Sequence, residues 1–246
     1  MNTTLNYSPN FDPKKRKPKN IKFIIFHYTG MKREIDAIKL LTDQKSKVSS
    51  HYFIKKNGEI LSLVPDLYVS WHAGISSWKK YKSINKYSIG IEISNSGRYY
   101  KNEKFTKKQI KSIIKLSRYL IKKYKIKFNL ILGHSDIAPD RKIDPGEKFP
   151  WKYLSKNNIS YWHSTDPKKL LNNRNKKVSN LEKDTFLKNI HKIGYPQISK
   201  FGKIKYMKIL TLAFQRRFRQ ELVNGIIDQE CLFISKNLIK IIDKFS

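Results

Sequence analysis

The stretch Ile21-Lys22-Phe23-Ile24-Ile25-Phe26 is a short run of β-branched and aromatic residues that follows a polar, proline-containing start of the chain. Such a run is typical of a strand that is buried in the centre of a sheet. The next residue is His27, so the strand is expected to present an imidazole at its C-terminal end. This strand is therefore the starting point for predicting both the fold and the site.

The segments that follow alternate between strand and helix patterns without a strict strand–helix–strand repeat. Asn57-Gly58 predicts a hairpin turn, because both central residues of the tightest hairpin turns need φ > 0. Thr106 and Gln109 form a capping-box pattern at the start of the clearest amphipathic helix. The predicted helices are 34–41 and 106–124, and the predicted strands are 21–26, 51–54, 59–64, 87–94 and 128–132. The fold class is therefore expected to be α/β, with a mixed central β-sheet flanked by helices.

The chain is expected to divide into four parts. Residues 1–20 contain Pro9, Pro13 and Pro18 and predict an extended N-terminal segment, and residues 21–155 hold the mixed sheet. Residues 156–179 are dense in Asn and Lys and predict a linker. Helical patterns return at a second capping box, formed by Ser179 and Glu182. Residues 180–246 therefore predict a small, separate bundle of three short helices.

The charge of the chain is its most conspicuous compositional feature. Lys and Arg number 52 against 19 Asp and Glu, which gives a formal net charge of +33. The excess extends over the sheet segment, the linker and the helical segment, and Lys, Asn and Ile are the residues that AT-rich codons favour. Nucleic-acid binding would instead need basic residues clustered with aromatic ones on one face. We therefore expect no nucleic-acid partner, although a positive surface would favour encounter with anionic molecules in general.

Other features of the composition limit the possible classes of protein. The single cysteine, Cys231, excludes an internal disulfide framework and a multi-cysteine metal cluster. No apolar run approaches the roughly 18 residues that span a bilayer, so no transmembrane segment is expected. The first 20 residues lack the apolar stretch of a secretory signal, which leaves the compartment open. The oligomeric state is unknown from sequence, with a monomer favoured.

Two of the six histidines follow predicted core strands. His27 ends the first strand, His134 ends the strand at 128–132, and Asp144 follows ten residues later in a loop. Two imidazoles and one carboxylate are a standard ligand set for catalytic Zn²⁺, which keeps a fourth position for water. The alternative is that each histidine is only a satisfied polar residue at a strand end.

Six short motifs occur in order along the first part of the chain. They are Phe26-His27-Tyr28-Thr29-Gly30, Ser50-His51-Tyr52-Phe53-Ile54, Trp71-His72-Ala73-Gly74, Ser88-Ile89-Gly90-Ile91-Glu92, Gly133-His134-Ser135-Asp136-Ile137-Ala138-Pro139 and Arg141-Lys142-Ile143-Asp144-Pro145-Gly146. Together they resemble the type-2 family of zinc-dependent N-acetylmuramoyl-L-alanine amidases. The resemblance spans about residues 20–155 and is closest to the AmiD branch of that family.

The resemblance implies a role for each residue that matches a family position. It puts one Zn²⁺ per chain on His27, His134 and Asp144, makes Glu92 the general base, and makes Lys142 the stabiliser of the oxyanion. Apolar neighbours of Glu92 would independently raise its pKa toward the range that a base needs. The resemblance also implies four candidate substrate contacts, which are Tyr28, Trp71 and His72 within the motifs and Asn95 three residues after Glu92.

The C-terminal segment resembles a three-helix peptidoglycan-binding module. The match rests on Ala213-Phe214-Gln215-Arg216-Arg217-Phe218 and Asn224-Gly225-Ile226-Ile227-Asp228. The alternative for this segment is a helical appendage that only packs on the catalytic part. A chain with both parts is expected to hydrolyse the amide between N-acetylmuramic acid, including its 1,6-anhydro form, and L-alanine in cell-wall turnover. A peptidoglycan-recognition protein that binds without cleaving is the alternative function.

The expected partner is peptidoglycan or a muropeptide, and the compartment depends on which of these is cut. The AmiD-like resemblance favours the cell envelope, and the lack of a visible signal leaves the cytoplasm open.

Overall fold

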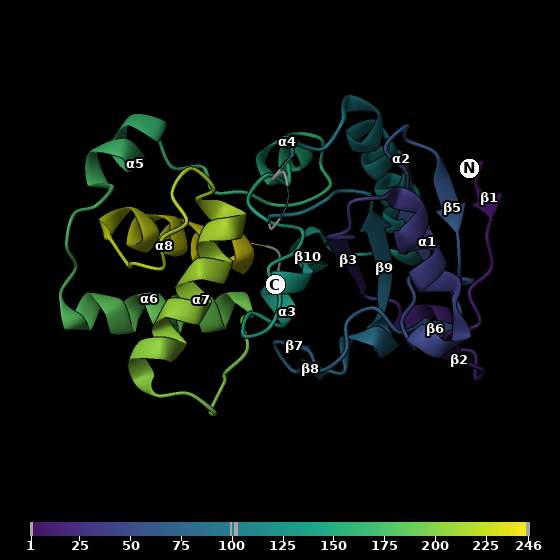
Figure 1. Cartoon of the computed structure of the whole chain (residues 1–246). Coiled ribbons are helices and arrows are strands. Elements are labelled where there is room, and N and C mark those ends of the chain that lie inside the picture. The colour runs from purple at the N-terminus through teal and green to yellow at the C-terminus, as the bar shows by residue number, and fades with distance from the viewer. Residues whose placement is uncertain (1, 99, 101–102, 245–246) are drawn as a thin grey trace.

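Figure 1 shows the computed structural model, which describes residues 2–98, 100 and 103–244. Residues 1 and 245–246, at the ends of the predicted N-terminal segment and helical bundle, lie outside the described residues. In the view of Figure 1, the sheet and its helices form one side of the molecule and the C-terminal helices form the other. The predicted α/β class, with a mixed sheet flanked by helices, is confirmed.

The central sheet has six strands in the order β1-β5-β4-β9-β3-β10. β3 is parallel to both of its neighbours, β9 and β10, and β9 is parallel to β4. Within this six-stranded sheet, β4 and β5 form the one antiparallel pair, and β1 pairs with β5 in parallel. The strand bounds are Thr4–Leu5 for β1, Phe23–Tyr28 for β3, Tyr52–Ile54 for β4, Ile60–Ser62 for β5, Ser88–Ile93 for β9 and Ile131–Gly133 for β10.

The two faces of this sheet have different partners. Ile24 and Phe26 of β3 lie in one apolar cluster with Ile89, Ile91 and Ile93 of β9, and this cluster includes α2 (Lys107–Tyr124). The alternate residues of β3 face the other side, because successive side chains in a strand point to opposite faces. On that side, α1 (Glu34–Thr42) packs against Phe53 of β4 at one end of the sheet.

The hairpin differs from its prediction in the turn. β4 and β5 form the expected antiparallel pair, but only Gly58 has a positive φ (87°), and Asn57 does not. Gly58 N–H donates to Lys55 O, and Lys55 N–H donates to Glu59 O, so the connection is longer than the two-residue turn. Asn57 Oδ1 instead accepts the Glu59 N–H at 2.9 Å. The side chain of Asn57 therefore closes the turn without left-handed backbone at its own position.

The strand predicted at 128–132 is also shorter. Residues Phe128–Leu130 form a 3-10 helix, and only Ile131–Gly133 pair with β3. The other short elements are β2 (Phe11–Asp12), β6 (Val69–Ser70), β7 (Ser77–Trp78) and β8 (Tyr81–Lys82), with 3-10 helices at Pro18–Asn20, Gln44–Ser46 and Ile84–Tyr87. β2 pairs with β6, so the N-terminal segment is tied to the sheet domain by two strands rather than only preceding it.

The C-terminal part contains the three expected helices, which are α6 (Asn180–Ile193), α7 (Lys203–Phe218) and α8 (Gln229–Asp243). We call residues 180–244 the helical unit. Three short helices precede it, namely α3 (His134–Ile137), α4 (Trp151–Lys156) and α5 (Pro167–Asn173), and α5 lies inside the predicted linker. Both predicted capping boxes are confirmed, at Thr106 of α2 and at Ser179 of α6.

The helical unit shares a hydrophobic core with the sheet. One cluster of buried residues contains Phe23 and Ile25 of β3 together with Phe186 of α6 and Phe214 of α7. The division into a catalytic part and a helical part stays a prediction, but the packing of the two parts is continuous. Among the residues that the structure describes, no helix combines the length and the apolar character that crossing a membrane requires.

Candidate metal centre

Three side chains from separate parts of the chain meet at the C-terminal end of β3. His27 is the fifth residue of β3, His134 begins α3 directly after β10, and Asp144 lies in the loop that follows α3. β3 and β10 are parallel neighbours, so their ends bring the two histidines together. All three residues are buried, and Ser135 N–H donates to Asp144 O at 2.8 Å, which ties the loop to α3.

The donor atoms of these residues are spaced for a metal ion. His27 Nδ1 lies 3.0 Å from His134 Nδ1 and 3.0 Å from Asp144 Oδ2, and His134 Nδ1 lies 3.1 Å from the same Oδ2. A tetrahedral Zn²⁺ with ligands at about 2.0–2.2 Å needs donor atoms roughly 3.3 Å apart. Three acceptor atoms this close repel one another unless a cation lies between them. We call these residues the metal-binding cluster, which fits the predicted zinc ligand set.

The outer nitrogen of His27 fixes its tautomer. His27 Nε2 lies 3.0 Å from His72 Nδ1, His72 Nε2 lies 2.9 Å from Ser88 Oγ, and Ser88 Oγ donates to Ile84 O at 2.8 Å. Because Ile84 O can only accept, each donor in this chain points away from the cluster. The chain leaves a lone pair on His27 Nδ1, which is the atom that faces the cluster.

His134 has an equivalent partner. Its Nε2 lies 3.2 Å from Ala73 O, so the ring donates there and keeps its Nδ1 lone pair for the cluster. The segment that carries Ala73 is held in turn by Arg141, whose guanidinium donates to Ala73 O and, through Nε at 3.0 Å, to Ile75 O. Ala73 and Arg141 both lie within the sequence motifs, but the sequence indicated no role for either residue.

The charges in the cluster favour the protonation states of a metal ligand set. Burial, followed by the effect of His134, lowers the pKa of His27 to about 4. Burial acts to raise the pKa of Asp144, but the neighbouring His134 and His27 outweigh it and hold that pKa well below its usual range. A neutral imidazole and an ionised carboxylate are the forms that coordinate zinc.

Glu92 lies beside the cluster on the neighbouring strand. In the β3–β9 register Glu92 is opposite His27, so the two side chains lie on the same face of the sheet. Glu92 Oε2 is buried and has no hydrogen-bond partner among the described residues. Burial, with a smaller effect of Asp144, raises the pKa of Glu92 to about 8. The arrangement is that of a carboxylate ready to exchange a proton near neutral pH.

Lys142 lies close enough to act on the same groups. Its positive charge lowers the pKa of His27 and opposes the rise in the pKa of Glu92. Lys142 is partly buried, two residues before Asp144 in the loop after α3. The structure therefore brings together the five residues that the sequence predicts as metal-binding or catalytic.

The four predicted substrate contacts have mostly internal partners. His72 is buried behind His27, and Trp71 Nε1 donates to Asp12 Oδ1 of β2 at 2.8 Å. Asn95 is buried, and its side-chain amide bonds Glu103 O and the Gly97 N–H. These contacts make His72, Trp71 and Asn95 part of the framework around the site, and substrate contact stays a prediction for them.

Tyr28, the fourth predicted contact, is partly buried at the end of β3. Three glycines with positive φ, Gly30, Gly97 and Gly146, surround its ring. A Cβ on Gly97 would lie 2.7 Å from the Tyr28 ring, and a Cβ on Gly146 would lie 3.2 Å from it. Glycine is therefore needed at these loop positions for both conformation and space.

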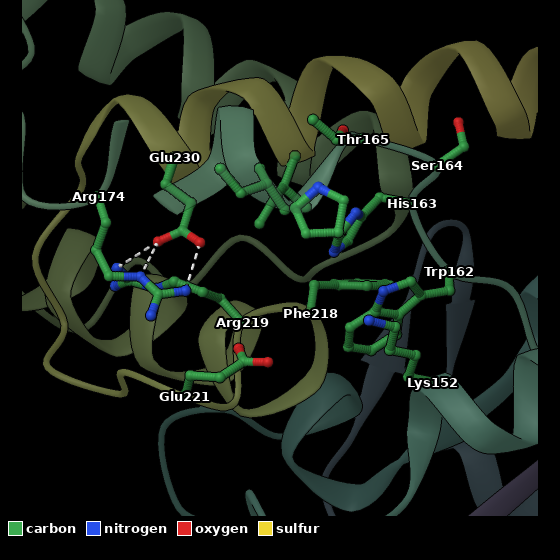
Figure 2. Close-up of a pocket in the computed structure, with 13 residues that line it drawn as sticks. Lys152, Trp162, His163, Ser164, Thr165, Arg174, Phe218, Arg219, Glu221 and Glu230 are labelled. Carbon is green, nitrogen blue, oxygen red and sulfur yellow. Dashed lines mark hydrogen bonds and ion pairs between the residues drawn. The ribbon is translucent and has the colours of Figure 1, made fainter. Parts of the chain in front are cut away.

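A separate cavity lies away from the metal-binding cluster. Figure 2 shows this cavity of about 240 Å³, bordered by Lys152 of α4, by Trp162 and His163, and by residues of α7 and α8. No residue of the metal-binding cluster lines it. The rings of Trp162 and His163, tilted by 35° with their centroids 5.0 Å apart, lie at one side, and a network of ion pairs around Glu230 closes the other side.

The fold and this site together define the class of protein. The profile of the family described as N-acetylmuramoyl-L-alanine amidase matches residues 17–147, which is more than half of the chain. The chain therefore belongs to the N-acetylmuramoyl-L-alanine amidase family, as its motifs predicted, and it is an enzyme of that class.

Individual relatives extend this result over most of the chain. The N-acetylmuramoyl-L-alanine amidase AmiD of Escherichia coli is 32% identical over 234 residues, which cover 89% of this chain and 83% of that protein. The 1,6-anhydro-N-acetylmuramyl-L-alanine amidase AmpD of Haemophilus influenzae is 35% identical over 167 residues, which cover 60% of this chain and 88% of that one. The helical unit is thus included in the match to AmiD.

Two solved structures are similar in fold across both parts of the chain. The complex of Escherichia coli AmiD with anhydro-N-acetylmuramic acid-L-Ala-D-gamma-Glu-L-Lys has a TM-score of 0.79 at 33% identity, and covers 90% of each chain. AmpDh3 from Pseudomonas aeruginosa, in complex with anhydromuramic pentapeptide, has a TM-score of 0.78 at 28% identity and covers 94% of each chain.

Proposed function

We propose that the chain is a zinc-dependent hydrolase of the amide bond between N-acetylmuramic acid and the L-alanine of a peptidoglycan stem peptide. The observation that carries this proposal is the metal-binding cluster beside the buried, unpartnered Glu92 Oε2. His27 Nδ1, His134 Nδ1 and Asp144 Oδ2 would hold one Zn²⁺ per chain. When bound, the ion polarises a water molecule and the substrate carbonyl.

The residues of the chain supply the proton transfers. Glu92 Oε2 takes a proton from the attacking water, and its raised pKa suits it to return that proton to the leaving amine nitrogen of L-alanine. The Lys142 ammonium, held next to the cluster by the Asp144 loop, stabilises the negative charge that develops on the carbonyl oxygen. The His27–His72–Ser88 chain keeps the His27 ring in one orientation throughout.

The substrate is proposed to be a muropeptide, in either the ordinary or the 1,6-anhydro form. Two relatives have solved structures with anhydromuramyl peptides, and both match this chain over its sheet domain and its helical unit. Stem peptides carry free carboxylates, which the net charge of +33 attracts over a distance. We place the enzyme in the cell envelope, where its polymer substrate lies; fractionation of cells with an antibody against the chain tests this location.

A product analysis tests the reaction. Purified protein is incubated with intact sacculi and with anhydromuropeptides, each with and without a chelator, and the products are identified by mass. We expect free stem peptides that begin with L-alanine, and their loss on chelation with recovery on added Zn²⁺. Product formation that is indifferent to chelation would contradict the role of the metal, and intact substrate throughout would contradict the activity.

A substitution of Glu92 tests the proposed base. The change Glu92→Gln keeps the shape of the side chain and removes the carboxylate, so we expect turnover to fall by roughly 10²- to 10⁴-fold with zinc still bound one to one. Glu59→Gln, in the hairpin between β4 and β5, is the control and should keep full activity. A Glu92→Gln variant with a near-wild-type rate would exclude Glu92 as the base.

A further inference from the structure

The turn that carries His134 is held by the helical unit as well as by its own strand. Asp136 lies two residues after His134 in α3, and its side chain is 1% exposed. Asp136 Oδ2 accepts the Gly133 N–H at 2.8 Å, which closes the first turn of α3. The other two donors to this carboxylate come from the helical unit. Arg217 Nη1 donates to Oδ2 at 2.6 Å, and the Tyr195 hydroxyl donates to Oδ1 at 2.8 Å.

Arg217 also holds the strand that leads into this turn. Its Nη2 donates to Ile131 O, at the start of β10, at 2.9 Å and to Ser160 Oγ at 3.3 Å. The guanidinium lies over the ring of Trp151, 4.1 Å from the ring centroid. A single side chain in the last turn of α7 thus fixes both the beginning of β10 and the carboxylate of Asp136. His134 lies on the backbone between these two points.

The Arg217–Asp136 ion pair is fully buried, with both side chains 1% exposed. Burial acts to lower the pKa of the Arg217 guanidinium, but the contact with Asp136 outweighs it and the pKa is raised, so the guanidinium is charged. A buried ion pair of this kind is rigid, because neither charge has an alternative partner in water. Removing one member leaves the other as an uncompensated buried charge, which forces the surrounding backbone to move.

We propose that Arg217 and Tyr195 are positioning residues for the zinc ligand His134, acting through Asp136. The helical unit then completes the metal centre, in addition to any contact that it makes with glycan. The physical reason is that a ligand contributes fully to metal affinity only when its donor atom is held in place before the ion binds. This inference rests on the proposed function, because it takes His134 to be a zinc ligand.

The chain contains a matched control for this ion pair. Arg219 is also 1% exposed, and its Nη1 lies 2.7 Å from Asp228 Oδ2 and 3.4 Å from Glu230 Oε2. Figure 2 shows that Arg174 joins Arg219 at Glu230, in a pocket that no residue of the metal-binding cluster lines. Arg219 and Arg217 are thus two buried arginines at the same end of α7. Only the ion pair of Arg217 reaches the turn of a metal ligand.

The experiment measures zinc affinity in the full-length chain by competition with a chromophoric chelator, with the visible spectrum of the Co²⁺-substituted protein as a second readout. We expect Arg217→Met to lower zinc affinity by about 10- to 100-fold, the range for residues that orient metal ligands, and to change the Co²⁺ spectrum. Arg219→Met is expected to lower stability in a similar way and to leave zinc affinity and spectrum as in the wild type.

Two further variants show whether Arg217 acts through Asp136. Asp136→Asn should lower zinc affinity as Arg217→Met does, and the double variant should lose no more than either single variant, because both changes break one interaction. If Arg217→Met fails to fold, Tyr195→Phe tests whether the helical unit positions His134 through Asp136. It removes one hydroxyl, keeps the ring against Trp78, and is expected to weaken zinc binding roughly threefold or more.

Three results would overturn the inference. The first is a folded Arg217→Met chain that binds zinc as tightly as the wild type does. If Arg217→Met does not fold, the same result in Tyr195→Phe takes its place. An equal loss of affinity in Arg219→Met is the second, since it would show a general effect of stability. A wild-type chain that binds no zinc is the third, and this result alone would also overturn the proposed function.

Discussion

At His27, the two ring nitrogens of one imidazole have different tasks. Nδ1 faces the other two members of the metal-binding cluster, and Nε2 faces His72 at 3.0 Å. The chain through His72 and Ser88 ends at a backbone carbonyl, which can only accept a hydrogen bond. The carbonyl of Ile84 therefore fixes which atoms of Ser88, His72 and His27 carry hydrogen. His27 Nδ1 is left unprotonated by the fold itself, as coordination of a metal ion would require.

Replacing His72 should weaken the metal site directly. In His72→Ala, His27 Nε2 loses its partner, so the ring can turn or change tautomer. We expect zinc affinity to fall by about 10- to 100-fold, measured by chelator competition. His191→Ala, in the helical unit, is the matched control and should bind zinc as the wild type does. Equal zinc affinity in both variants would show that the hydrogen bond from His27 to His72 is dispensable.

The raised pKa of Glu92 makes stability depend on pH in the metal-free protein. Its folded-state pKa of about 8 exceeds the value near 4.3 in an unfolded chain. The contribution of this carboxyl to stability is thus fully present below about pH 4, and is lost as the pH rises through about 8. The Glu92→Gln variant cannot ionise there. We expect the free energy of unfolding of Glu92→Gln, relative to that of the wild type, to be greater at about pH 9 than at about pH 5. Urea unfolding in the presence of a chelator measures it. A difference between variant and wild type that is the same at both pH values would contradict this account.

Much of the site at residue level was predictable from sequence. Strand-end positions and residue types indicated His27, His134 and Asp144 before any geometry was known, since the ends of neighbouring parallel strands lie together. The orientation of side chains that the motifs only placed nearby was not predictable. The hydrogen bond from Trp71 to Asp12 could not be predicted, because the two residues lie 59 positions apart and leave no local signal. Substrate contact by Trp71 and Asn95 stays a prediction.

At the level of elements, β9 presents one polar row toward the site. Ser88, Gly90 and Glu92 lie two residues apart and so share a face, while the intervening isoleucines pack toward α2. Ser88 receives the hydrogen bond of His72, Gly90 leaves space for its ring, and Glu92 lies beside His27. One strand of six residues therefore carries the proposed base and supports one member of the metal-binding cluster.

Gly90→Ala should disturb this row. A Cβ at position 90 would lie 2.4 Å from the His72 ring, and a central strand cannot shift to make room. We expect a loss of about 1–3 kcal/mol in the free energy of unfolding, together with weaker zinc binding. Gly202→Ala is the control, because a Cβ there meets no atom within 4 Å. Urea unfolding measures the first effect, and an unchanged Gly90→Ala variant would show that the space around His72 is not limiting.

Elements with strong local signals were predicted well. The helix α2 and both capping boxes follow from residues within one or two turns of each other, so the sequence was sufficient. The turn at Asn57-Gly58 and the start of β10 differ from prediction. In the first case a side-chain hydrogen bond replaced left-handed backbone at Asn57, and in the second only Ile131–Gly133 pair with β3.

At the scale of the whole molecule, the helical unit is part of the core. Phe23 and Ile25 of the sheet share one buried cluster with Phe186, Phe214 and Phe218. The sequence predicted a small bundle of three helices and left open whether it packs on the catalytic part, since the apolar faces of α6 and α7 do not reveal which surface they will cover. Because one core includes both parts, we expect the sheet and the helical unit to unfold together.

Phe214→Ala tests this cooperativity. Its ring packs 5.0 Å from that of Phe186, and its loss should cost about 3–5 kcal/mol in the free energy of unfolding. We expect the helical signal in circular dichroism and the release of zinc to shift together in urea, because one core supports both. The surface variant Leu181→Ala should shift neither. A shift of the helical signal alone would show that the two parts unfold independently.

The sequence by itself determined the family, the order of the motifs and the helices that carry their own caps, and it predicted the ligand and base residues. These features depend on residue type and short spacing, which the chain displays directly. Only the tertiary structure decided that His72 orients His27, that the helical unit packs on the sheet, and that Arg217 reaches Asp136 over 81 positions. The physical reason is that buried hydrogen bonds and ion pairs are formed by whichever groups the packed core brings together, irrespective of their separation in the chain.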